Sequence, residues 1–389
     1  MADLKVCYVA NHAINNSFEG HNIASIRIIE AAVNAGIDAR VVTLENTTTQ
    51  ARTHFYSVRS SSKVHRKTTS IPSVWEVVSS LPAILTTKNL HCDVVHLLNV
   101  TKEVFLINSK LFRMGKKCAS HFYHSSYPFN AYLAFQIRSL MIKIRLFDQI
   151  LSSNLSLFRY LTNTLGVSEE RVHFVPYPVD INKFKPLDRH ELREKSRIPE
   201  DAFVVAYVGA IDPDRGFFVL LRAFKKIIKE NRNVILHISH PSKDRRMEDL
   251  LSTYVNDSVM KKHIVIQGIN PHIEETYANA DVVALPFEKP YWITAPPLVL
   301  LEAMASGTPI VTTPVDVIGE IGSNMSDMLF ATPGDTDSLV NAILHVLENQ
   351  EETRRMGVTA RQKIIRDFSM QVVGKKLLET YTKICNYAQ

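Results

Sequence analysis

Short apolar runs alternate with helical patterns along the chain. Five runs in the first half are typical of strands: LKVCYVAN, DARVVTL, CDVVHLL, KCASHFYH and DQILSS. The stretch HNIASIRIIEAAVNAG, between the first two runs, has apolar residues near helical spacing. Strand-like runs separated by helices predict an α/β fold in which helices cover a parallel sheet.

A second series of the same kind follows a polar, proline-marked segment at residues 184–201. Its strand-like runs are AFVVAYVGA, NVILHIS, HIVIQG, DVVALPF and TPIVTT. A chain of 389 residues also exceeds what one hydrophobic core usually serves. We therefore predict two doubly wound, Rossmann-like domains, residues 1–185 and 186–369, which face each other across a cleft, and a final helix over residues 370–389.

Ligands of doubly wound sheets bind beyond the carboxyl ends of the strands, so residues there are the site candidates. Gly20 opens a helix after the first strand, and Gly209 ends the first strand of the second series. Arg215, at a helix start, can donate hydrogen bonds to two phosphate oxygens at once. The alternative is a surface arginine that pairs with a neighbouring aspartate. His124 ends the strand KCASHFYH, where a proton carrier, a hydrogen-bond donor and a structural histidine all remain open.

The segment ITAPPLVLLEAMASGTPIV predicts a short helix that leads into a strand. Two prolines at its start leave the amides of Leu298 and Val299 as free donors at the positive end of the helix dipole, which indicates an anion site. An ordinary helix explains every residue except Glu302, because an ionised Glu is seldom buried without a partner. A solvated Glu302 is the alternative.

Composition and cysteine spacing narrow the function classes. The chain is 46% hydrophobic and 22% charged, no apolar run reaches the roughly 18 residues of a membrane span, and its start lacks the layout of a cleavable signal. We therefore expect a cytoplasmic protein. The four cysteines have no CxxC spacing, so we expect small buried thiols rather than a zinc site or a disulfide framework.

The basic residues are concentrated in the first half of the chain. Residues 1–186 hold 21 Lys and Arg against 12 Asp and Glu, whereas the remainder holds 24 against 27. This excess implies an anionic partner, and nucleic acid is the weakest choice because no recognition motif for it occurs. Residues 129–147 have an apolar face with basic neighbours, which suits docking on an anionic membrane surface; a core-packing helix is the alternative.

Several motifs in the second half occur together in one order. They are YVGAIDPDRG, QGINPHIEETYANADVVALPF, PPLVLLEAMASGTPIVTTPV, FATPGDTDSLVNAI, MGVTARQKIIRDFSM and LLETYTKI. From about residue 170 onward the chain thereby resembles glycosyltransferase family 4, the retaining nucleotide-sugar enzymes of GT-B fold. The resemblance implies transfer of a sugar from a nucleotide-diphosphate donor to the hydroxyl of an acceptor glycan or glycolipid, without a metal or another cofactor. It also implies that the final helix packs back on the first domain.

The resemblance assigns roles to the candidate residues. It implies that Glu302 holds the donor's ribose and that Arg215, with the amides of Leu298 and Val299, meets the diphosphate. His124 matches the family's cleft histidine, a sugar contact and transition-state stabiliser. Further donor-binding positions are Gly20, Gly209, Ile269 and Thr294.

Three positions depart from the family pattern. Thr294 stands where the family has a Glu that contacts the donor sugar, Pro297 replaces its usual Gly, and Ala210 replaces a frequent Arg. These departures motivate an alternative function, a catalytically silent nucleotide-sugar-binding or regulatory subunit. His240, in HISHPS, replaces a GxG loop, and we expect it to form an inert turn.

The role of His124 can be tested by replacing it with Ala. A residue that stabilises the transition state is needed more for the chemical step than for nucleotide binding. We therefore expect His124→Ala to lose far more turnover than nucleotide affinity. Turnover and nucleotide binding measured on the same preparation check this, and equal losses in both would count against the role.

Overall fold

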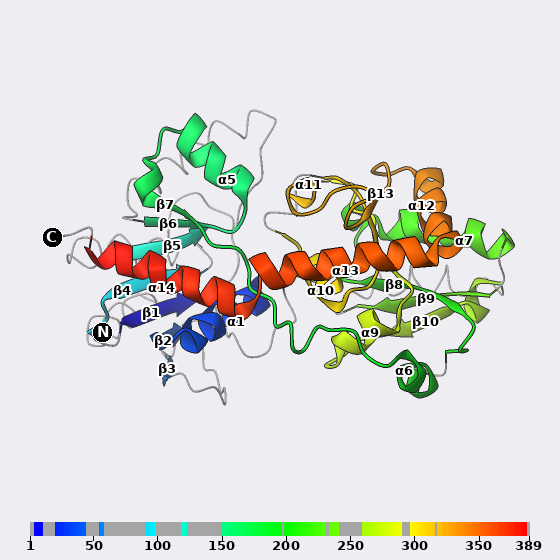
Figure 1. The fold of residues 1–389 in the computed structure, drawn as a ribbon, viewed down its shortest axis with the longest axis horizontal. Coiled ribbons are helices and arrows are strands. Elements are labelled where there is room, and N and C mark those ends of the chain that lie inside the picture. The colour runs from blue at the N-terminus through cyan, green and yellow to red at the C-terminus, as the bar shows by residue number, and fades with distance from the viewer. Residues whose placement is uncertain are drawn as a thin grey trace, which may run out of the picture. The chain divides into compact units, whose positions relative to one another are not determined.

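The computed structural model of the protein describes residues 4–10, 20–43, 54–57, 91–98, 118–122, 149–196, 198–230, 233–240, 259–289, 296–315 and 317–386. The chain divides into two compact units. Unit 1 comprises Met1–Pro178 together with Met370–Gln389, and unit 2 comprises Val179–Ser369 (Figure 1). The second unit thus begins at Val179 rather than at residue 186, and the end of the chain belongs to the first unit.

Unit 1 contains a seven-stranded parallel sheet in the order β3-β2-β1-β4-β5-β6-β7. Its strands are β1 (Lys5–Ala10), β2 (Asp38–Thr43), β3 (His54–Ser57), β4 (Val94–Leu98), β5 (Cys118–Phe122), β6 (Gln149–Ser152) and β7 (Val172–Phe174). The strand order reverses between β1 and β4, which makes the sheet doubly wound. All five predicted strands are present. The strands β3 and β7, of four and three residues at the two edges of the sheet, were not predicted from the sequence.

The helices of unit 1 come from both ends of the chain. Those in the described ranges are α1 (Gly20–Asn34), α5 (Leu155–Arg159), the π-helical turn η1 (Tyr160–Thr164), the 3-10 turn η2 (Glu169–Arg171) and α14 (Met370–Asn386). Helix α14 packs closely on α1, because a Cβ atom added to Gly374 would lie 2.3 Å from the carbonyl oxygen of Ala31. The Tyr381 hydroxyl of α14 also lies 2.6 Å from Nδ1 of His96 and 3.1 Å from the Tyr8 hydroxyl, in the buried core over β1 and β4.

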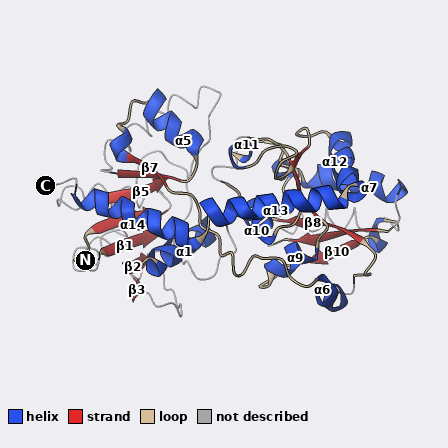
Figure 2. Cartoon of the chain, viewed as in Figure 1, coloured by secondary structure: helices blue, strands red, loops and turns tan. Residues whose placement is uncertain are grey.

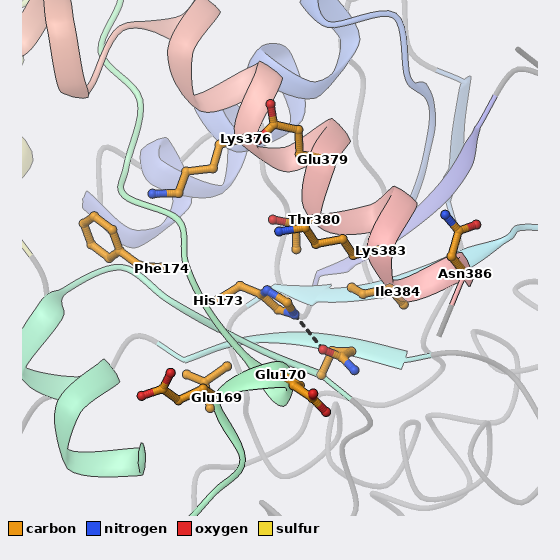
Figure 3. A pocket seen from close by; sticks show the side chains of 12 residues that line it. Glu169, Glu170, His173, Phe174, Lys376, Glu379, Thr380, Lys383, Ile384 and Asn386 are labelled. Carbon is orange, nitrogen blue, oxygen red and sulfur yellow. Dashed lines mark hydrogen bonds between the residues drawn. The ribbon is translucent and has the colours of Figure 1, made fainter. Parts of the chain in front are cut away.

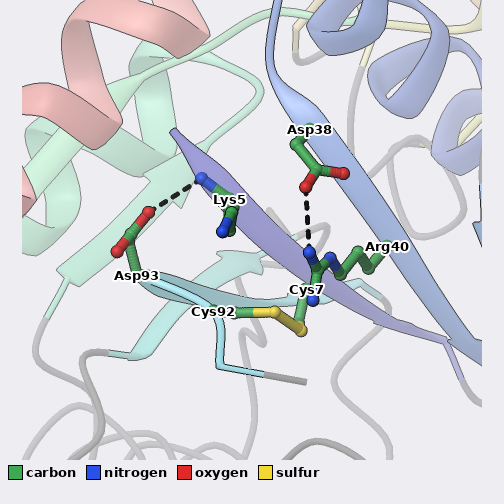
Figure 4. Close-up of a disulfide and its surroundings, with 6 residues drawn as sticks. All are labelled: Lys5, Cys7, Asp38, Arg40, Cys92 and Asp93. Carbon is green, nitrogen blue, oxygen red and sulfur yellow. Dashed lines mark hydrogen bonds and ion pairs between the residues drawn. A yellow bond between two sulfur atoms is a disulfide. The ribbon is translucent and has the colours of Figure 1, made fainter. Parts of the chain in front are cut away.

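Two cysteines of unit 1 are not the free thiols expected from the sequence. Cys7 and Cys92 form a disulfide with a Cα–Cα distance of 5.8 Å (Figure 4). The expectation of buried thiols was wrong for this pair, although both residues are buried. The pairing of β1 with β4, in which Val6 lies opposite Val94, brings the two cysteines together. Their separation of 85 residues gave no signal of this in the sequence.

Unit 2 repeats the same architecture. Its six-stranded parallel sheet has the order β10-β9-β8-β11-β12-β13, so the reversal falls between β8 and β11. The strands are β8 (Phe203–Val208), β9 (Val234–Ser239), β10 (Ile264–Gln267), β11 (Val282–Leu285), β12 (Ile310–Thr312) and β13 (Leu329–Phe330). All five predicted strands are present, and only the two-residue β13 was missed.

Helices surround the strands of unit 2 (Figure 2). The helices that the structure describes here are α6 (Arg189–Ser196), η3 (Pro213–Arg215), α7 (Phe217–Glu230), η4 (Met260–Lys262), α9 (Ile273–Asn279), α10 (Leu298–Ser306), α11 (Ile318–Ile321), α12 (Thr336–Glu348) and α13 (Gln350–Asp367). Helix α7 places Phe217, Leu220 and Phe224 in a core shared with residues of β8, β9 and α12. The predicted α/β fold with two Rossmann-like units is confirmed, and the cleft between them stays a prediction.

The described helices can be compared with the requirements of a membrane-spanning helix. No helix in the described ranges combines the length and the apolar character that spanning a bilayer requires. Residues 129–147, the segment predicted to dock on a membrane surface, lie outside those ranges.

The contact between α14 and α1 gives a stability prediction. Gly374→Ala should lower the stability of unit 1 by about 1–3 kcal/mol, because the added methyl group would overlap the Ala31 carbonyl and force the helices apart. Thermal and denaturant unfolding measure this. Gly319→Ala in α11 is the matched control, since its added Cβ would meet nothing within 4 Å. Equal stability of the two variants would contradict the prediction.

Candidate functional site

The first predicted site residue lies where β8 ends. Gly209 follows Val208 directly, at the point where the strand order of unit 2 reverses. Its φ of +145° is a backbone conformation that favours glycine, and its amide donates to the Ser239 carbonyl at 3.0 Å. Ligands of doubly wound sheets bind at this reversal point, so Gly209 borders the expected ligand position.

The loop after Gly209 is held against the end of β11. Asp212 caps the short turn η3 through its side chain, which accepts from the amide of Asp214 at 2.8 Å. Gly216 follows with φ +70°, and a Cβ atom there would lie 1.7 Å from the Pro286 carbonyl oxygen. The Glu288 amide also donates to the Asp214 carbonyl at 3.0 Å. The backbone around Arg215 is therefore fixed at the carboxyl edge of two central strands.

The Arg215 side chain is half-buried and lies beside Gly209. Its Nη1 atom is 3.9 Å from the position that a Cβ atom on Gly209 would occupy. Within the described part of the chain, the guanidinium makes no hydrogen bond or ion pair, and Asp214 pairs with Lys289 instead at 2.8 Å. The alternative, an Arg215 paired with a neighbouring aspartate, is therefore not observed. Among the described residues, no acidic side chain pairs with the Arg215 guanidinium, which lies at the end of β8.

Tyr207 lies beneath the same loop. Its hydroxyl donates to the Ala210 carbonyl at 2.6 Å, which fixes the turn after Gly209. Burial raises the pKa of the Tyr207 phenol, while the charge of Arg215 opposes that shift. Ala210, where the family often has an Arg, thus contributes its carbonyl to a fixed turn.

The start of α10 leaves two amides available. Pro297 precedes the helix with φ −58°, and its carbonyl accepts from Leu300 at 2.9 Å and from Leu301 at 3.1 Å. The amides of Leu298 and Val299 donate to no residue that the structure describes. Helix α10 follows β11, so these two donors lie at the carboxyl edge of the sheet, as Gly209 does. That they bind a diphosphate stays a prediction.

Glu302 lies one turn into α10 and is only 5% exposed. Its Oε2 atom accepts a hydrogen bond from the Tyr277 hydroxyl at 2.9 Å, and Tyr277, on α9, is fully buried. The alternative of a solvated Glu302 is therefore wrong. Tyr277 was not predicted from the sequence, because its partner is 25 residues away and nothing in the pattern of α9 marks it.

Two of the remaining candidate residues, Ile269 and His240, follow neighbouring strands of the same sheet. Ile269 follows β10 and is 42% exposed. His240 follows β9 and is buried, and its amide donates to the Gln267 carbonyl at 3.1 Å. Whether His240 is an inert turn stays a prediction. Gly20 is the first residue of α1 in unit 1, and His124 and Thr294 lie outside the described residues.

A separate pocket of about 600 Å³ lies in unit 1, between α14 and the residues of η2, β6 and β7 (Figure 3). At its base, His173 Nε2 lies 2.6 Å from Gln149 Oε1. The ammonium group of Lys376 lies 4.4 Å from the centre of the Phe174 ring. Burial, and secondarily the charge of Lys383, lower the pKa of His173 to about 4. None of the predicted donor-binding residues lines this pocket.

A family model matches most of unit 2. The family model described as "Glycosyl transferases group 1" matches residues 188–363. A galactosyltransferase of Escherichia coli, named UDP-Gal:alpha-D-GlcNAc-diphosphoundecaprenol alpha-1,3-galactosyltransferase, is 26% identical over 219 residues, which are 56% of this chain and 55% of that protein. An MMP alpha-(1->4)-mannosyltransferase of Mycolicibacterium hassiacum is 28% identical over 56% of this chain and 50% of its own. The chain thus spans about half the length of the curated relatives it matches.

Solved structures match nearly the whole chain. HepE from Anabaena, in complex with UDP and glucose, has a TM-score of 0.77 at 15% identity and covers 97% of this chain and 99% of its own. Sucrose-phosphate synthase from Thermosynechococcus elongatus has a TM-score of 0.76 at 18% identity, over 99% of this chain and 100% of its own. At these identities the likeness shows the fold alone.

Two Rossmann-like units with the same strand order define the GT-B fold, which the solved structures share. Residues 188–363 match the model of the family Glycosyl transferases group 1. The resemblance seen in the sequence is confirmed for this part of the chain.

The low pKa of His173 gives a pH-dependent prediction. The unfolded chain takes up a proton on this residue below pH 6.5, whereas the folded chain does so only near pH 4, so the stability of unit 1 falls as the pH drops between these values. His173→Gln should remove this component. Relative to the wild type, the variant should gain about 1–2 kcal/mol between pH 7 and pH 4.5, a value reduced for the partial exposure of the ring.

Thermal unfolding at pH 7, 5.5 and 4.5 measures this difference. His190→Asn is the control, because that ring is exposed in unit 2 and pairs with the exposed Glu200. The assignment to His173 is wrong if the two variants follow the same pH profile.

Proposed function

We propose that the protein is a retaining glycosyltransferase, which moves a sugar from a nucleotide-diphosphate sugar to an acceptor hydroxyl. The observation that carries this proposal is the family match over residues 188–363, which coincides with the unit that holds Arg215, the two available amides and Glu302. The relatives named above support it, since they are galactosyl- and mannosyltransferases.

The groups at the sheet edge of unit 2 suit a departing nucleotide diphosphate. The charge that develops on it in the transition state would be met by the guanidinium of Arg215 and by the amides of Leu298 and Val299. Fixed donors of this kind stabilise the charge without reorganising, because the loop is held by Gly216 against Pro286. This arrangement supplies positive charge from the protein itself, and we propose that it is used without a metal.

In the proposed reaction, the bond between the anomeric carbon and the diphosphate oxygen breaks while the acceptor oxygen bonds to the same face of the sugar. The departing phosphate oxygen takes the acceptor's proton. We propose His124 as the residue that contacts the sugar and stabilises this transition state. Thr294 would lie near the donor sugar, and Gly20, Gly209 and Ile269 would complete the donor site.

We propose a lipid-linked or glycan acceptor. The Escherichia coli relative acts, by its name, on a sugar carried by diphosphoundecaprenol. The basic excess in residues 1–186 would attract such an anionic carrier or the membrane that holds it. The protein would then work in the cytoplasm, peripherally on the membrane surface.

A catalytically silent sugar-nucleotide-binding subunit is the second candidate. It is favoured by Pro297 and Ala210, which replace residues usual in the family, and by Thr294 at the donor-sugar position. Both candidates bind nucleotide through Glu302 and Arg215, so only turnover separates them. Formation of free sugar or of a glycosylated acceptor from the bound donor would establish the enzyme.

A thermal-shift panel of UDP-, GDP- and ADP-sugars tests the proposal first. A bound donor should raise the melting temperature, because it stabilises only the folded protein. Arg215→Ala should weaken binding of the selected donor by about 10–100-fold, which corresponds to one or two charge-assisted hydrogen bonds.

Arg222→Ala is the matched control, since Arg222 is an exposed arginine of α7 outside the site. It should bind the donor as the wild type does. The proposal is rejected if no member of the panel raises the melting temperature, or if the Arg215 and Arg222 variants lose affinity equally.

A further inference from the structure

We propose that Tyr277 is a positioning residue for the nucleotide's pentose, acting through Glu302. Its hydroxyl would hold the carboxylate in the orientation that receives the ribose hydroxyls. This inference rests on the proposed function, because it assumes that Glu302 faces a nucleotide.

The contact between the two side chains is direct and shielded from water. The Tyr277 hydroxyl donates to Oε2 of Glu302 at 2.9 Å, Tyr277 is fully buried and Glu302 is 5% exposed. An ionised carboxylate can only accept hydrogen bonds, so the phenol must be the donor. Charge-assisted hydrogen bonds of this kind are about twice as strong as neutral ones.

The carboxylate needs such a partner to bind a pentose well. The terminal torsion of a Glu side chain has broad, roughly two-fold preferences, so it does not fix the plane of the carboxylate. Two vicinal hydroxyls can be accepted together only if that plane is set. A donor anchored on one oxygen sets it, and the carboxylate retains lone pairs for further donors.

Tyr277 is itself fixed from several sides. Its carbonyl accepts from the Thr308 hydroxyl at 2.7 Å, which ties α9 to the segment after α10. The Phe184 ring meets the Tyr277 ring edge-on, with 6.0 Å between the ring centres. A phenol held at both its backbone and its ring can position Glu302 before the ligand arrives, which reduces the ordering cost of binding.

Tyr277→Phe removes only the hydroxyl and so tests this role. We expect binding of UDP to weaken about 10-fold, while 2′,3′-dideoxy-UDP binds with nearly unchanged affinity, because the dideoxy sugar never uses the oriented carboxylate. The guanosine and adenosine diphosphate pairs serve as probes if the donor panel selects those bases. In a transfer assay, KM for the donor should rise while kcat changes less.

A double-mutant cycle shows whether Tyr277 acts through Glu302. In the Glu302→Ala background, Tyr277→Phe should cause no further loss of UDP affinity, since the group that it orients is gone. Tyr381→Phe is the matched control: it removes another fully buried tyrosine hydroxyl, which bonds to His96 in unit 1. This control should lower the melting temperature and leave the discrimination between UDP and its dideoxy form intact.

Three outcomes overturn the inference in distinguishable ways. If the wild type binds no nucleoside diphosphate, the proposed function fails and this inference fails with it. If the wild type binds UDP but Tyr277→Phe weakens UDP and dideoxy-UDP equally, Tyr277 has only a structural role. If the losses of Tyr277→Phe and Glu302→Ala add, the two residues act independently.

Discussion

The pairing of β8 with β9 on one side and β11 on the other is the constraint on which the rest of unit 2 depends. Because all strands of this sheet run parallel, every strand ends at the same edge. Because the strand order reverses at β8, the loops after β8 and β11 lead to opposite faces of the sheet. Gly209, the η3 turn and the start of α10 are gathered at that edge by the hydrogen bonds of the sheet rather than by contacts among themselves.

Backbone contacts make this edge rigid and leave its polar groups available. The approach of Gly216 to the Pro286 carbonyl, the cap by Asp212 and the bond from Tyr207 to Ala210 all fix main-chain positions. The side chain of Arg215 is spared from these contacts, and Asp214 is occupied by Lys289. Among the residues that the structure describes, the half-buried Arg215 cation and the amides of Leu298 and Val299 have no partner, which costs stability and is typical of binding sites rather than of structural loops.

Much of this fold could be predicted from the sequence, and the exceptions have physical reasons. Strands such as β8 and β4 are buried on both faces and therefore appear as continuous apolar runs, whereas β3, β7 and β13 are too short or too polar to stand out. Long-range partners were not predictable. The Cys7–Cys92 disulfide and the bond from Tyr277 to Glu302 join segments that no local pattern relates. The position of Glu302 in its motif indicated a role, but not that a buried tyrosine would hold it.

The return of the chain to unit 1 has a consequence for biosynthesis. Unit 2 is one continuous stretch, Val179–Ser369, and contains all the residues of its own sheet and core. Unit 1 requires α14, whose Tyr381 and Gly374 are buried against β4 and α1. During synthesis on the ribosome, unit 1 therefore cannot complete its fold until residues 370–386 have emerged. Until then, the surface that α14 will cover stays exposed. All residues of unit 2 have been synthesised before α14, so unit 2 can complete its fold before unit 1 does.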